Sequence, residues 1–372
     1  MKIHTRIVSL IVLFSVAILA FAGCGASKPA ETPAQSQEQP AADKKTDAGS
    51  ETPAKSADKP ETVTIGHFSG NDDNLLVKEK GWLEEEFAKD GIKVKWVNFQ
   101  SGREMNSAML AKSIDFAGGI GDPPVTIAAS SGIPYQIYWI SNIIAESEAL
   151  AVRNGANINS IKELKGKKIA TTVTSTSHYS LLSALDLNGL TASDVQIIDL
   201  NPQDIVAAWQ RGDIDAAYTW DPNLSKLYAD GKKLISSKDL ADAGAPTSAY
   251  NIVRTDFAEK YPQIVDAYIK ALIKAQDLYK NTPDSATEVW AKALSIDKAE
   301  SLKQAQGNNW LTPEEQLSSK FLGTSAQKGD TVKSLKKIGD FLVDQKSLPG
   351  KLEASAYEKF VNPAYLEKAL KK

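Results

Sequence analysis

Cysteine is almost absent from this chain. Cys24 is the only one among 372 residues, which excludes an intrachain disulfide and a cluster of thiolate metal ligands. Histidine is nearly as scarce, and because His4 falls in a leader segment, only His67 and His178 remain. Their spacing from acids is not typical of a metalloenzyme. We therefore expect no metal site and no cofactor.

The chain also has no excess of positive charge. The formal net charge is −3, so the sequence carries no electrostatic footprint for binding nucleic acid. The glycine-rich run 118–121 lacks the Lys-Ser/Thr ending of a P-loop, which makes it weak as a phosphate site. We expect no nucleic-acid partner.

The first residues read as an export signal. Lys2 and Arg6 precede the apolar run 7–22, which is too short for a comfortable membrane span and suits a secretory signal. The run ends in Phe21-Ala22-Gly23-Cys24, which resembles the lipobox of bacterial lipoproteins. We expect a signal peptide over 1–23 and a lipid on Cys24. The lipid would hold the protein at the cell membrane, on its extracytoplasmic side, without a membrane span.

The composition of residues 25–60 predicts a segment without stable structure. From residue 25 to residue 60 there is no aromatic residue and no Val, Ile, Leu or Met. Such a segment cannot bury enough apolar surface to order itself. We expect residues 24–60 to form a lipidated, flexible linker.

The rest of the chain alternates between strands and helices. The length of 61–372 is natural for two domains. Apolar, β-branched runs predict strands over 62–68, 94–99, 114–120, 133–140, 148–153, 167–170, 194–200, 215–220 and 249–254. Helical spacing predicts helices near 75–83, 105–112, 123–131, 177–188, 204–211, 261–279, 286–294, 313–322 and 333–345. The alternation predicts an α/β fold of two lobes, each a mainly parallel sheet with helices on both faces.

We expect two strands, 148–153 and 249–254, to carry the chain between the lobes. We expect a first part of lobe 1 over 61–150, lobe 2 over 151–250, and a mainly helical return to lobe 1 over 251–372. Ligands of such sheets bind outside the carboxyl ends of the strands. The polar turns expected to meet there are 69–72, 121–123, 174–177, 220–222 and 245–248.

One of these turns is rich in hydroxyl groups. Residues 174–177 read Thr-Ser-Thr-Ser and stand where a strand passes into a helix. The first N–H groups of a helix lack intrahelical partners, and the helix dipole is positive there. The run could bind an oxyanion such as a sulfonate, or it could simply cap the helix. The residues alone leave both interpretations open.

Three stretches resemble a known family. Residues 174–182, 207–218 and 244–247 look like the matching parts of taurine-binding proteins of ABC importers, within the wider sulfonate, nitrate and taurine solute-binding family. The resemblance implies a two-lobed periplasmic-binding fold of type II. It also implies that the protein binds taurine or another small aliphatic sulfonate between its lobes and delivers it to a membrane permease. We expect the protein to be a monomer.

The resemblance also implies site residues. The hydroxyl run, above all Ser175, Thr176 and Ser177, would hold the sulfonate. In taurine binders a carboxylate two residues after the Gly-Ala-Pro-Thr run takes the ammonium, but Ala249 stands there in this chain. The full set of expected ligand-binding residues is Ser69, Asp72, Gly121, Asp122, Thr174, Ser175, Thr176, Ser177, His178, Trp220, Asp221 and Thr247.

The departure at position 249 leaves two explanations open. Either the ammonium partner has moved to Asp72, Asp122 or Asp221, or the solute is a different sulfonate. Trp220 would pack on the alkyl part of the solute, or it is simply a wall of the cleft, whereas Trp209 reads as core.

Other functions remain as alternatives. The same fold could bind nitrate or a thiamine-precursor-like solute, or act as an extracytoplasmic sensor. An enzyme is not expected, because the pyrimidine-synthesising branch of this fold uses a cysteine-rich motif and no cysteine follows Cys24.

Overall fold

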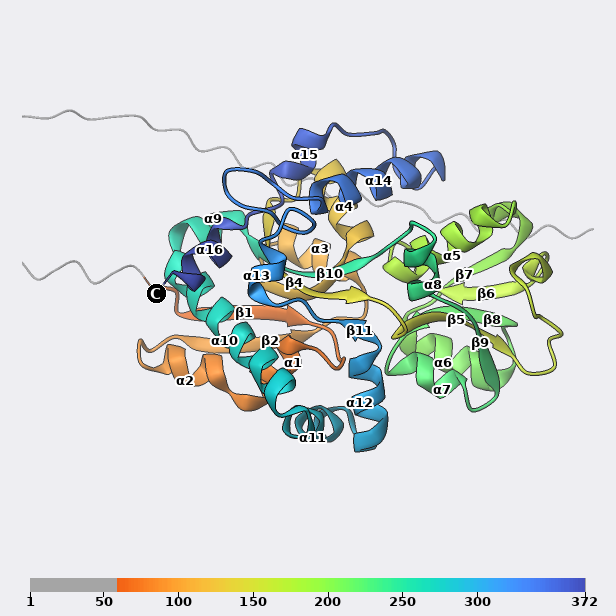
Figure 1. The fold of residues 1–372 in the computed structure, drawn as a ribbon, viewed down its shortest axis with the longest axis horizontal. Helices are drawn as coiled ribbons and strands as arrows, with labels where there is room; N and C mark the ends of the chain where they lie inside the picture. The colour runs from red at the N-terminus through yellow and green to blue at the C-terminus, as the bar shows by residue number, and fades with distance from the viewer. Residues whose placement is uncertain (1–58, 372) are drawn as a thin grey trace, which may run out of the picture. The chain divides into compact units, whose positions relative to one another are not determined.

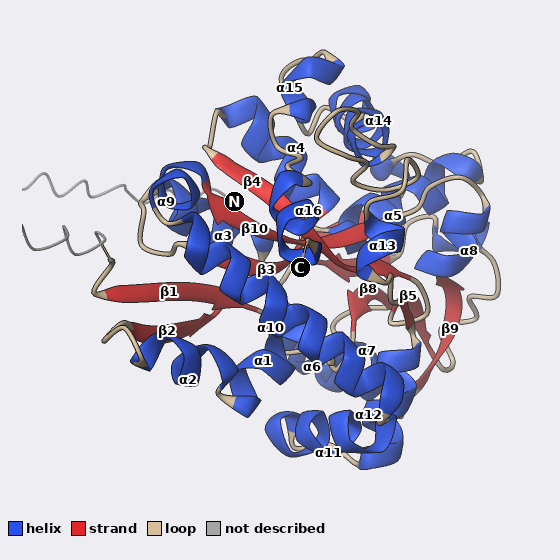
Figure 2. Cartoon of the chain, turned by 60° about the vertical axis from the view of Figure 1, so that its left-hand side comes forward, coloured by secondary structure: helices blue, strands red, loops and turns tan. Residues whose placement is uncertain are grey.

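The computed structural model describes residues 59–371. The predicted signal peptide over 1–23, the lipid site at Cys24 and nearly all of the linker over 24–60 lie outside the described residues. Within the described part, the chain forms two sheets with helices packed around each of them (Figures 1 and 2).

The larger sheet has six strands in the order β11-β4-β10-β3-β1-β2. The central strands β1 and β3 run parallel to each other, and β2 runs parallel to β1. Strand β10 lies antiparallel between β3 and β4, and β11 adds an antiparallel edge. The strands are β1 (Thr62–His67), β2 (Lys93–Asn98), β3 (Phe116–Gly121), β4 (Tyr135–Ile144), β10 (Ser248–Arg254) and β11 (Asn308–Asn309).

The smaller sheet has five strands in the order β7-β6-β8-β5-β9. Strand β6 is parallel to both β7 and β8, whereas β5 is antiparallel to both β8 and β9. The strands are β5 (Glu148–Arg153), β6 (Lys168–Thr171), β7 (Gln196–Asp199), β8 (Ala216–Trp220) and β9 (Gly231–Ser236).

The strand pairing corrects one detail of the sequence prediction. Both sheets are mixed rather than mainly parallel, because β5 and β10, which follow the two passages between the sheets, enter their sheets in the opposite direction to their neighbours. Parallel pairing is confined to the units that a helix connects, such as β1-α1-α2-β2 and β6-α5-β7. The alternation of elements detected these units, but it did not reveal the direction of the passing strands.

Most helices surround the six-stranded sheet, and together they form what we call the first lobe. They are α1 (Asp73–Lys80), α2 (Trp82–Ala88), α3 (Gly102–Leu110), α4 (Asp122–Ser131), α9 (Thr255–Lys260), α10 (Pro262–Asn281), α11 (Pro283–Leu294), α12 (Lys298–Gln306), α13 (Pro313–Gln316), α15 (Ala354–Glu358) and α16 (Ala364–Leu370). The helix expected over 313–322 ends early, because the chain turns back and the Leu322 N–H donates to the Gln316 carbonyl.

The five-stranded sheet and its helices form what we call the second lobe. Its helices are α5 (Thr176–Leu187), α6 (Pro202–Arg211), α7 (Asn223–Leu227) and α8 (Ser237–Asp242), with short 3₁₀ turns at Ile161–Leu164 and Ala192–Asp194. Trp209 of α6 is buried in the core of this lobe, as predicted.

Helix α14 (Thr331–Asp344) packs against both lobes. Its residue Leu335 belongs to the core of the first lobe, whereas Ile338 and Leu342 belong to a core of the second lobe. Apolar residues spaced by three and four positions place these side chains along one face of the helix. The C-terminal part of the chain therefore contributes to the contact between the lobes.

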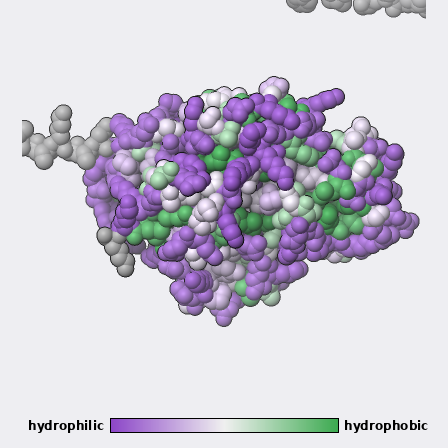
Figure 3. All heavy atoms as spheres, turned by 45° about the horizontal axis from the view of Figure 1, so that its top comes forward, coloured by the Kyte–Doolittle hydropathy of each residue, from purple (hydrophilic) through white to green (hydrophobic). Residues whose placement is uncertain are grey.

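The visible surface of the described part is mainly hydrophilic, with small hydrophobic areas (Figure 3). Among residues 59–371 only Leu110 and Leu187 are large hydrophobic side chains that stand well exposed. No helix within the same range combines the length and the apolar character needed to cross a membrane.

Candidate functional site

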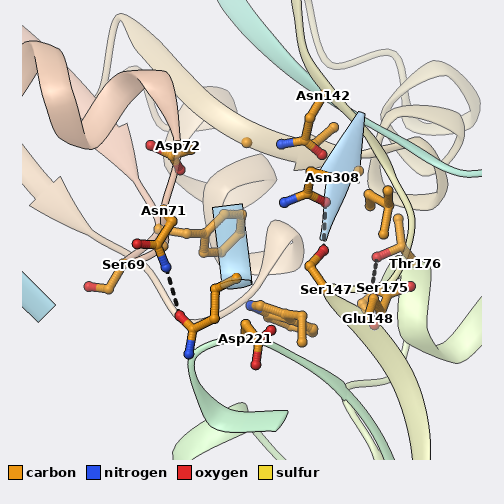
Figure 4. Close-up of a pocket in the computed structure, with 18 of the residues that line it drawn as sticks. Ser69, Asn71, Asp72, Asn142, Ser147, Glu148, Ser175, Thr176, Asp221 and Asn308 are labelled. Atoms are coloured by element: carbon orange, nitrogen blue, oxygen red, sulfur yellow. Dashed lines mark hydrogen bonds between the residues drawn. The ribbon is translucent and has the colours of Figure 1, made fainter. Parts of the chain in front are cut away.

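A cavity of about 120 Å³ lies between the two lobes (Figure 4). The first lobe contributes Phe68 to Asp72, Gly102 and Gly121, and the second lobe contributes Glu148, Trp220 and Asp221. The volume is small compared with the roughly 300–1,000 Å³ of drug-sized sites. The cavity therefore suits a small solute.

Seven of the twelve expected ligand-binding residues line this cavity. They are Ser69, Asp72, Gly121, Ser175, Thr176, Trp220 and Asp221. The other five do not line it: Asp122, Thr174, Ser177, His178 and Thr247. The turns that the sequence analysis expected to converge do lie close together, but only some of their side chains face the space between the lobes.

Helices α3 and α5, one from each lobe, both begin at the cavity. Gly102 opens α3, and Thr176 opens α5, and both line the cavity. The caps Ser101 and Ser175 accept hydrogen bonds only from the third residues beyond them. The first two backbone N–H groups of each helix thus stay available for a ligand, and both dipoles add positive potential.

Three of the four hydroxyl protons of the Thr-Ser-Thr-Ser turn, those of Ser175, Thr176 and Ser177, are already engaged. Ser175 Oγ donates to the Thr172 carbonyl at 2.6 Å. Thr176 Oγ1 and Ser177 Oγ donate to Glu148 Oε2 at 2.5 and 2.9 Å. A hydroxyl has a single proton to donate. In this arrangement an anion near the turn would meet backbone N–H groups rather than hydroxyl protons.

Glu148 is a site residue that the sequence analysis missed. It stands at the start of β5, is 1 % exposed and lines the cavity. Its other oxygen, Oε1, accepts from Ser237 Oγ at 2.8 Å and from Ser180 Oγ at 3.4 Å. Burial raises the pKa of Glu148, and these hydroxyl donors offset part of that rise. The sequence did contain a signal for this residue: Glu148 is the one charged residue in the otherwise apolar run Glu-Ala-Leu-Ala-Val.

Asp122 is buried behind the cavity wall. Its two oxygens accept from the Tyr250 hydroxyl at 2.6 Å and from the Ser248 N–H at 2.5 Å. Burial raises its pKa to about 7, while these two donors act in the opposite direction. The carboxyl group thus ties β10 to the start of α4 and has both oxygens occupied.

Asp72 and Asp221 do line the cavity, and both serve as local caps. Asp72 caps α1, where its Oδ1 accepts from the Leu75 N–H at 2.7 Å, and burial raises its pKa to about 7. Asp221 Oδ1 accepts from both the N–H and the hydroxyl of Ser225, at 3.0 and 2.6 Å. Burial raises the pKa of Asp221 to about 6.

The three remaining predicted residues lie near the cavity without lining it. His178 is 7 % exposed, and burial lowers its pKa to about 4, so the ring is neutral at pH 7. Thr174 adopts a left-handed backbone with φ of 69°, and its N–H points at His178 Nδ1. Thr247 is buried, and its hydroxyl has no hydrogen-bond partner among the described residues.

Amide side chains form a further group that the sequence analysis did not detect. Asn71, Asn142, Gln304 and Asn308 all line the cavity. Asn71 Nδ2 donates to Gln304 Oε1 at 2.6 Å (Figure 4). Gln304 Nε2 in turn donates to Ser225 Oγ of the second lobe at 3.3 Å. Gln304 and Asn308 belong to the helical return of the chain, where no motif marked them.

Within this group of amide side chains, Asn142 has an oxygen without a hydrogen-bond partner among the described residues. The residue is 7 % exposed, and the oxygen is its Oδ1. Its strand partner is Ala249, which also lines the cavity. No carboxylate therefore enters the cavity from position 249.

Across 59–371 no group of three or more His, Cys, Asp or Glu residues is arranged to hold a metal ion.

Comparison with known proteins identifies the relatives of this chain. The family described as NMT1/THI5 like matches residues 74–286. The taurine-binding periplasmic protein of Escherichia coli is 35 % identical over 76 % of this chain and 86 % of its own length. A putative aliphatic sulfonates-binding protein of Bacillus subtilis is 32 % identical over 60 % of this chain and 67 % of its own length.

Solved structures share the fold. The alkanesulfonate-binding protein SsuA from Xanthomonas axonopodis, bound to MOPS, superposes with a TM-score of 0.69 at 22 % identity, covering 81 % of this chain and 99 % of SsuA. The aliphatic sulphonate binding protein SsuA from Escherichia coli gives a TM-score of 0.66 at 23 % identity, with 82 % and 99 % covered. The predicted two-lobed periplasmic-binding fold of type II is thus confirmed.

Proposed function

The chain belongs to the NMT1/THI5-like family, and from this premise we propose that it is the solute-binding component of an ABC importer for taurine or another small aliphatic sulfonate. The observation that carries the proposal is the meeting of the α3 and α5 N-termini, one from each lobe, at a small cavity. Backbone N–H groups at helix N-termini bind anions with oxygen atoms.

In this proposal the sulfonate lies between Gly102 of α3 and Thr176 of α5. The N–H groups of the first turns donate to its oxygens, and charge-assisted hydrogen bonds of this kind are about twice as strong as neutral ones. The hydroxyls of Thr176 and Ser177 support the site indirectly, because they hold α5 against Glu148. The alkyl part of the solute packs against Trp220 and Phe68.

The transport cycle follows from the two lobes. The solute first binds to one lobe, the lobes close over it, and the closed form is recognised by the permease. Strand pairing supports lobes near the predicted bounds 61–150, 151–250 and 251–372, with passages at 145–147 and 245–247. Closure excludes water, which strengthens the hydrogen bonds to the sulfonate.

A ligand screen tests the proposed function. Taurine or ethanesulfonate, at about 100 times its dissociation constant, should stabilise the purified protein by about 2.7 kcal/mol. A rise of the unfolding midpoint in thermal-shift experiments would show this. Stabilisation by nitrate or a pyrimidine, with no effect of any sulfonate, would overturn the proposal in favour of the nitrate-like or thiamine-precursor-like alternative.

We further propose that the protein is a lipid-anchored monomer outside the cytoplasm. The signal over 1–23, the cysteine at its end and the unstructured composition of 25–60 support the anchor. The relatives named as periplasmic binding proteins support the location. The small number of exposed large hydrophobic residues within 59–371 supports a monomer. The same relatives support a non-enzymatic, transport role rather than catalysis.

The anchor leads to a separate prediction. Cys24→Ala should abolish the attachment of fatty acid to the protein, because the thiol that carries the lipid is gone. Fatty-acid labelling of whole cells, followed by immunoprecipitation, would check it. Labelling that persists in Cys24→Ala would contradict the assignment, and a conservative change in the linker, Ser36→Ala, is the matched control.

A further inference from the structure

Among residues 59–371, no positively charged side chain lines the cavity between the lobes. Three of the lining residues are acidic, namely Asp72, Glu148 and Asp221, and none is a lysine, an arginine or a histidine. The amide side chains of the wall carry no net charge: Asn71, Asn142, Gln304 and Asn308. The positive potential that these residues leave for an anion comes from the backbone where α3 and α5 begin.

The two helices balance one negative charge and leave a second one unbalanced. A helix N-terminus acts like roughly half an elementary charge, so α3 and α5 together supply about one. The Born cost of removing an ion from water grows with the square of its charge, so a dianion costs about four times as much to bury as a monoanion of equal size. A cavity of about 120 Å³ holds little water that could reduce this cost.

Glu148 places a carboxyl group beside the start of α5, where the proposed sulfonate lies (Figure 4). Its Oε2 accepts from the hydroxyls of Thr176 and Ser177, the first two residues of this helix, at 2.5 and 2.9 Å. Its Oε1 accepts from Ser237 and Ser180 at 2.8 and 3.4 Å. Hydroxyl donors stabilise a carboxylate without neutralising its charge. The charge of a ligand at α5 therefore acts directly against Glu148.

The other two acidic residues of the cavity are bound to different helices. Asp72 accepts from the Leu75 N–H and caps α1, whereas Asp221 accepts from Ser225 of α7. Among the described residues, no hydrogen bond joins either carboxyl group to α3 or α5. Glu148 is thus distinguished from both by its direct bonds to the first turn of α5.

We propose that Glu148 limits the cavity to oxyanions with a single negative charge, so that the protein accepts sulfonates and rejects dianions of the same shape, such as alkylphosphonates in alkaline solution. The inference rests on the proposed function, from which it takes the position of the sulfonate between α3 and α5. A second negative charge on the ligand would repel the Glu148 carboxylate in a site poor in water. Such a dianion binds only when it or Glu148 takes up a proton.

Alkylphosphonates are suitable probes because they differ from alkanesulfonates mainly in charge. Both carry a tetrahedral head group with three oxygens. The sulfonate stays a monoanion, whereas the phosphonate gains a second negative charge as the pH rises, as phosphate monoesters do at about pH 6. Ethanesulfonate and ethylphosphonate form one pair with identical tails, and taurine and 2-aminoethylphosphonate form another. The ratio of the two dissociation constants within a pair therefore reports on the head group.

Calorimetric titration of the purified protein with both pairs tests the proposal. At about pH 9, wild-type protein should bind each sulfonate at least about a hundredfold more tightly than its phosphonate partner. Glu148→Gln removes the charge but keeps groups that bond to hydroxyls, and it should lower this ratio at least about tenfold. Asp221→Asn, which removes a carboxyl group not bound to α5, should lower the ratio less. Asp204→Asn, an exposed change on the same lobe, should leave it unchanged.

The ratio separates a selectivity role from a merely structural one. If Glu148 only held α5 in place, Glu148→Gln would weaken both members of a pair equally, and an unchanged ratio would overturn the proposal. An equal effect of Asp221→Asn would overturn the assignment to Glu148. Equal wild-type affinities within a pair at about pH 9 would overturn the limit to a single charge. Binding of no sulfonate at all would instead overturn the proposed function.

The pH dependence of the wild-type protein tests the limit to a single charge even if Glu148→Gln does not fold. Lowering the pH from about 9 to about 5 converts ethylphosphonate into a monoanion. It also favours protonation of Glu148, because burial raises the pKa of this carboxyl group. The ratio should therefore fall to within about threefold at the lower pH. A ratio that stays constant with pH would overturn the proposal.

Other titratable groups near Glu148 are common to wild type and variant. Asp122 of α4 and Tyr218 of β8 face Glu148, and its charge contributes to the raised pKa of each of them. Asp72 and Asp221 line other parts of the cavity. Glu148→Gln retains all four groups, so the ratio should fall less steeply with pH in this variant than in wild type. Identical pH profiles of the two proteins would contradict the assignment to Glu148.

Discussion

Gly121→Ala is expected to weaken solute binding by about ten- to hundredfold. Gly121 ends β3 in the first lobe, and a Cβ atom there would lie 2.5 Å from Thr176 Cγ2 of the second lobe. Carbon atoms do not approach so closely, so an alanine fits only if the lobes separate or Thr176 leaves the rotamer in which it donates to Glu148. Because the cavity is formed by both lobes, a wider cleft loses contacts on both sides of the solute.

The steric origin of this effect can be tested directly by a compensating change. Thr176→Ser removes Cγ2 but keeps the hydroxyl that donates to Glu148. The double variant Gly121→Ala/Thr176→Ser should recover most of the lost affinity, whereas Thr176→Ser alone should have little effect. Titration calorimetry on the four proteins gives the coupling free energy as a double-mutant cycle. Equal losses in the single and double variants would show that the clash with Thr176 is not the cause.

Backbone conformation does not complicate this test. Gly121 has φ of −81°, in the extended region that any residue adopts, so alanine introduces no backbone strain. The unfolding midpoint of Gly121→Ala in the absence of solute should therefore stay close to that of wild type, apart from the effect of the lobe contact. A large loss of stability would mean that the residue is essential for folding of the first lobe instead.

The fold was accessible from the sequence because local patterns decide most of it. The strand and helix that flank residues 172–175 come from an apolar run and a leucine-rich helical pattern, and the structure has β6 and α5 there. Short or polar elements escaped prediction, among them β9, whose exposed Lys232 and Lys233 hide its strand character, and α12. The direction of β5 and β10 also escaped, since it depends on contacts between distant segments.

The site was less accessible, for a physical reason. A sequence motif can identify a turn. Whether the hydroxyl groups of that turn bind an anion depends on which other acceptors in the folded protein take their protons. The hydroxyls of Thr176 and Ser177 could bind an anion only if no better acceptor were present, and Glu148 is such an acceptor, 28 and 29 residues earlier in the chain. Asn142 lies on β4 beyond the predicted strand 133–140, Gln304 lies on the unpredicted helix α12, and no motif marks either residue. Which carboxyl group faces the cavity likewise depends on hydrogen bonds that spacing alone cannot reveal.

Glu148→Leu is expected to lower the free energy of unfolding by about 3–5 kcal/mol. Leucine fills a similar volume, but it accepts no hydrogen bond. The hydroxyls of Thr176, Ser177, Ser180 and Ser237 would lose the acceptor that they share, in a region where each of them is buried. Each unsatisfied buried donor costs about 1–3 kcal/mol, and some hydroxyls would recover part of this by pairing with each other. Urea unfolding followed by circular dichroism measures the loss.

Glu148→Gln separates the effect of the hydrogen bonds around position 148 from the effect of the buried negative charge. Its amide can donate to hydroxyl oxygens, and hydroxyl groups can reverse from donor to acceptor, so most bonds around position 148 can form again. The folded protein raises the pKa of Glu148 above its usual 4.5 because burial penalises the ionised form. The contribution of this group to stability is thus full below pH 4.5 and is lost as the pH rises through the folded-state pKa. Glutamine does not titrate, so the stability difference should shift in favour of Glu148→Gln as the pH rises. A difference that is constant with pH would show that the burial of the charge is not penalised, and that the hydroxyl donors fully compensate it.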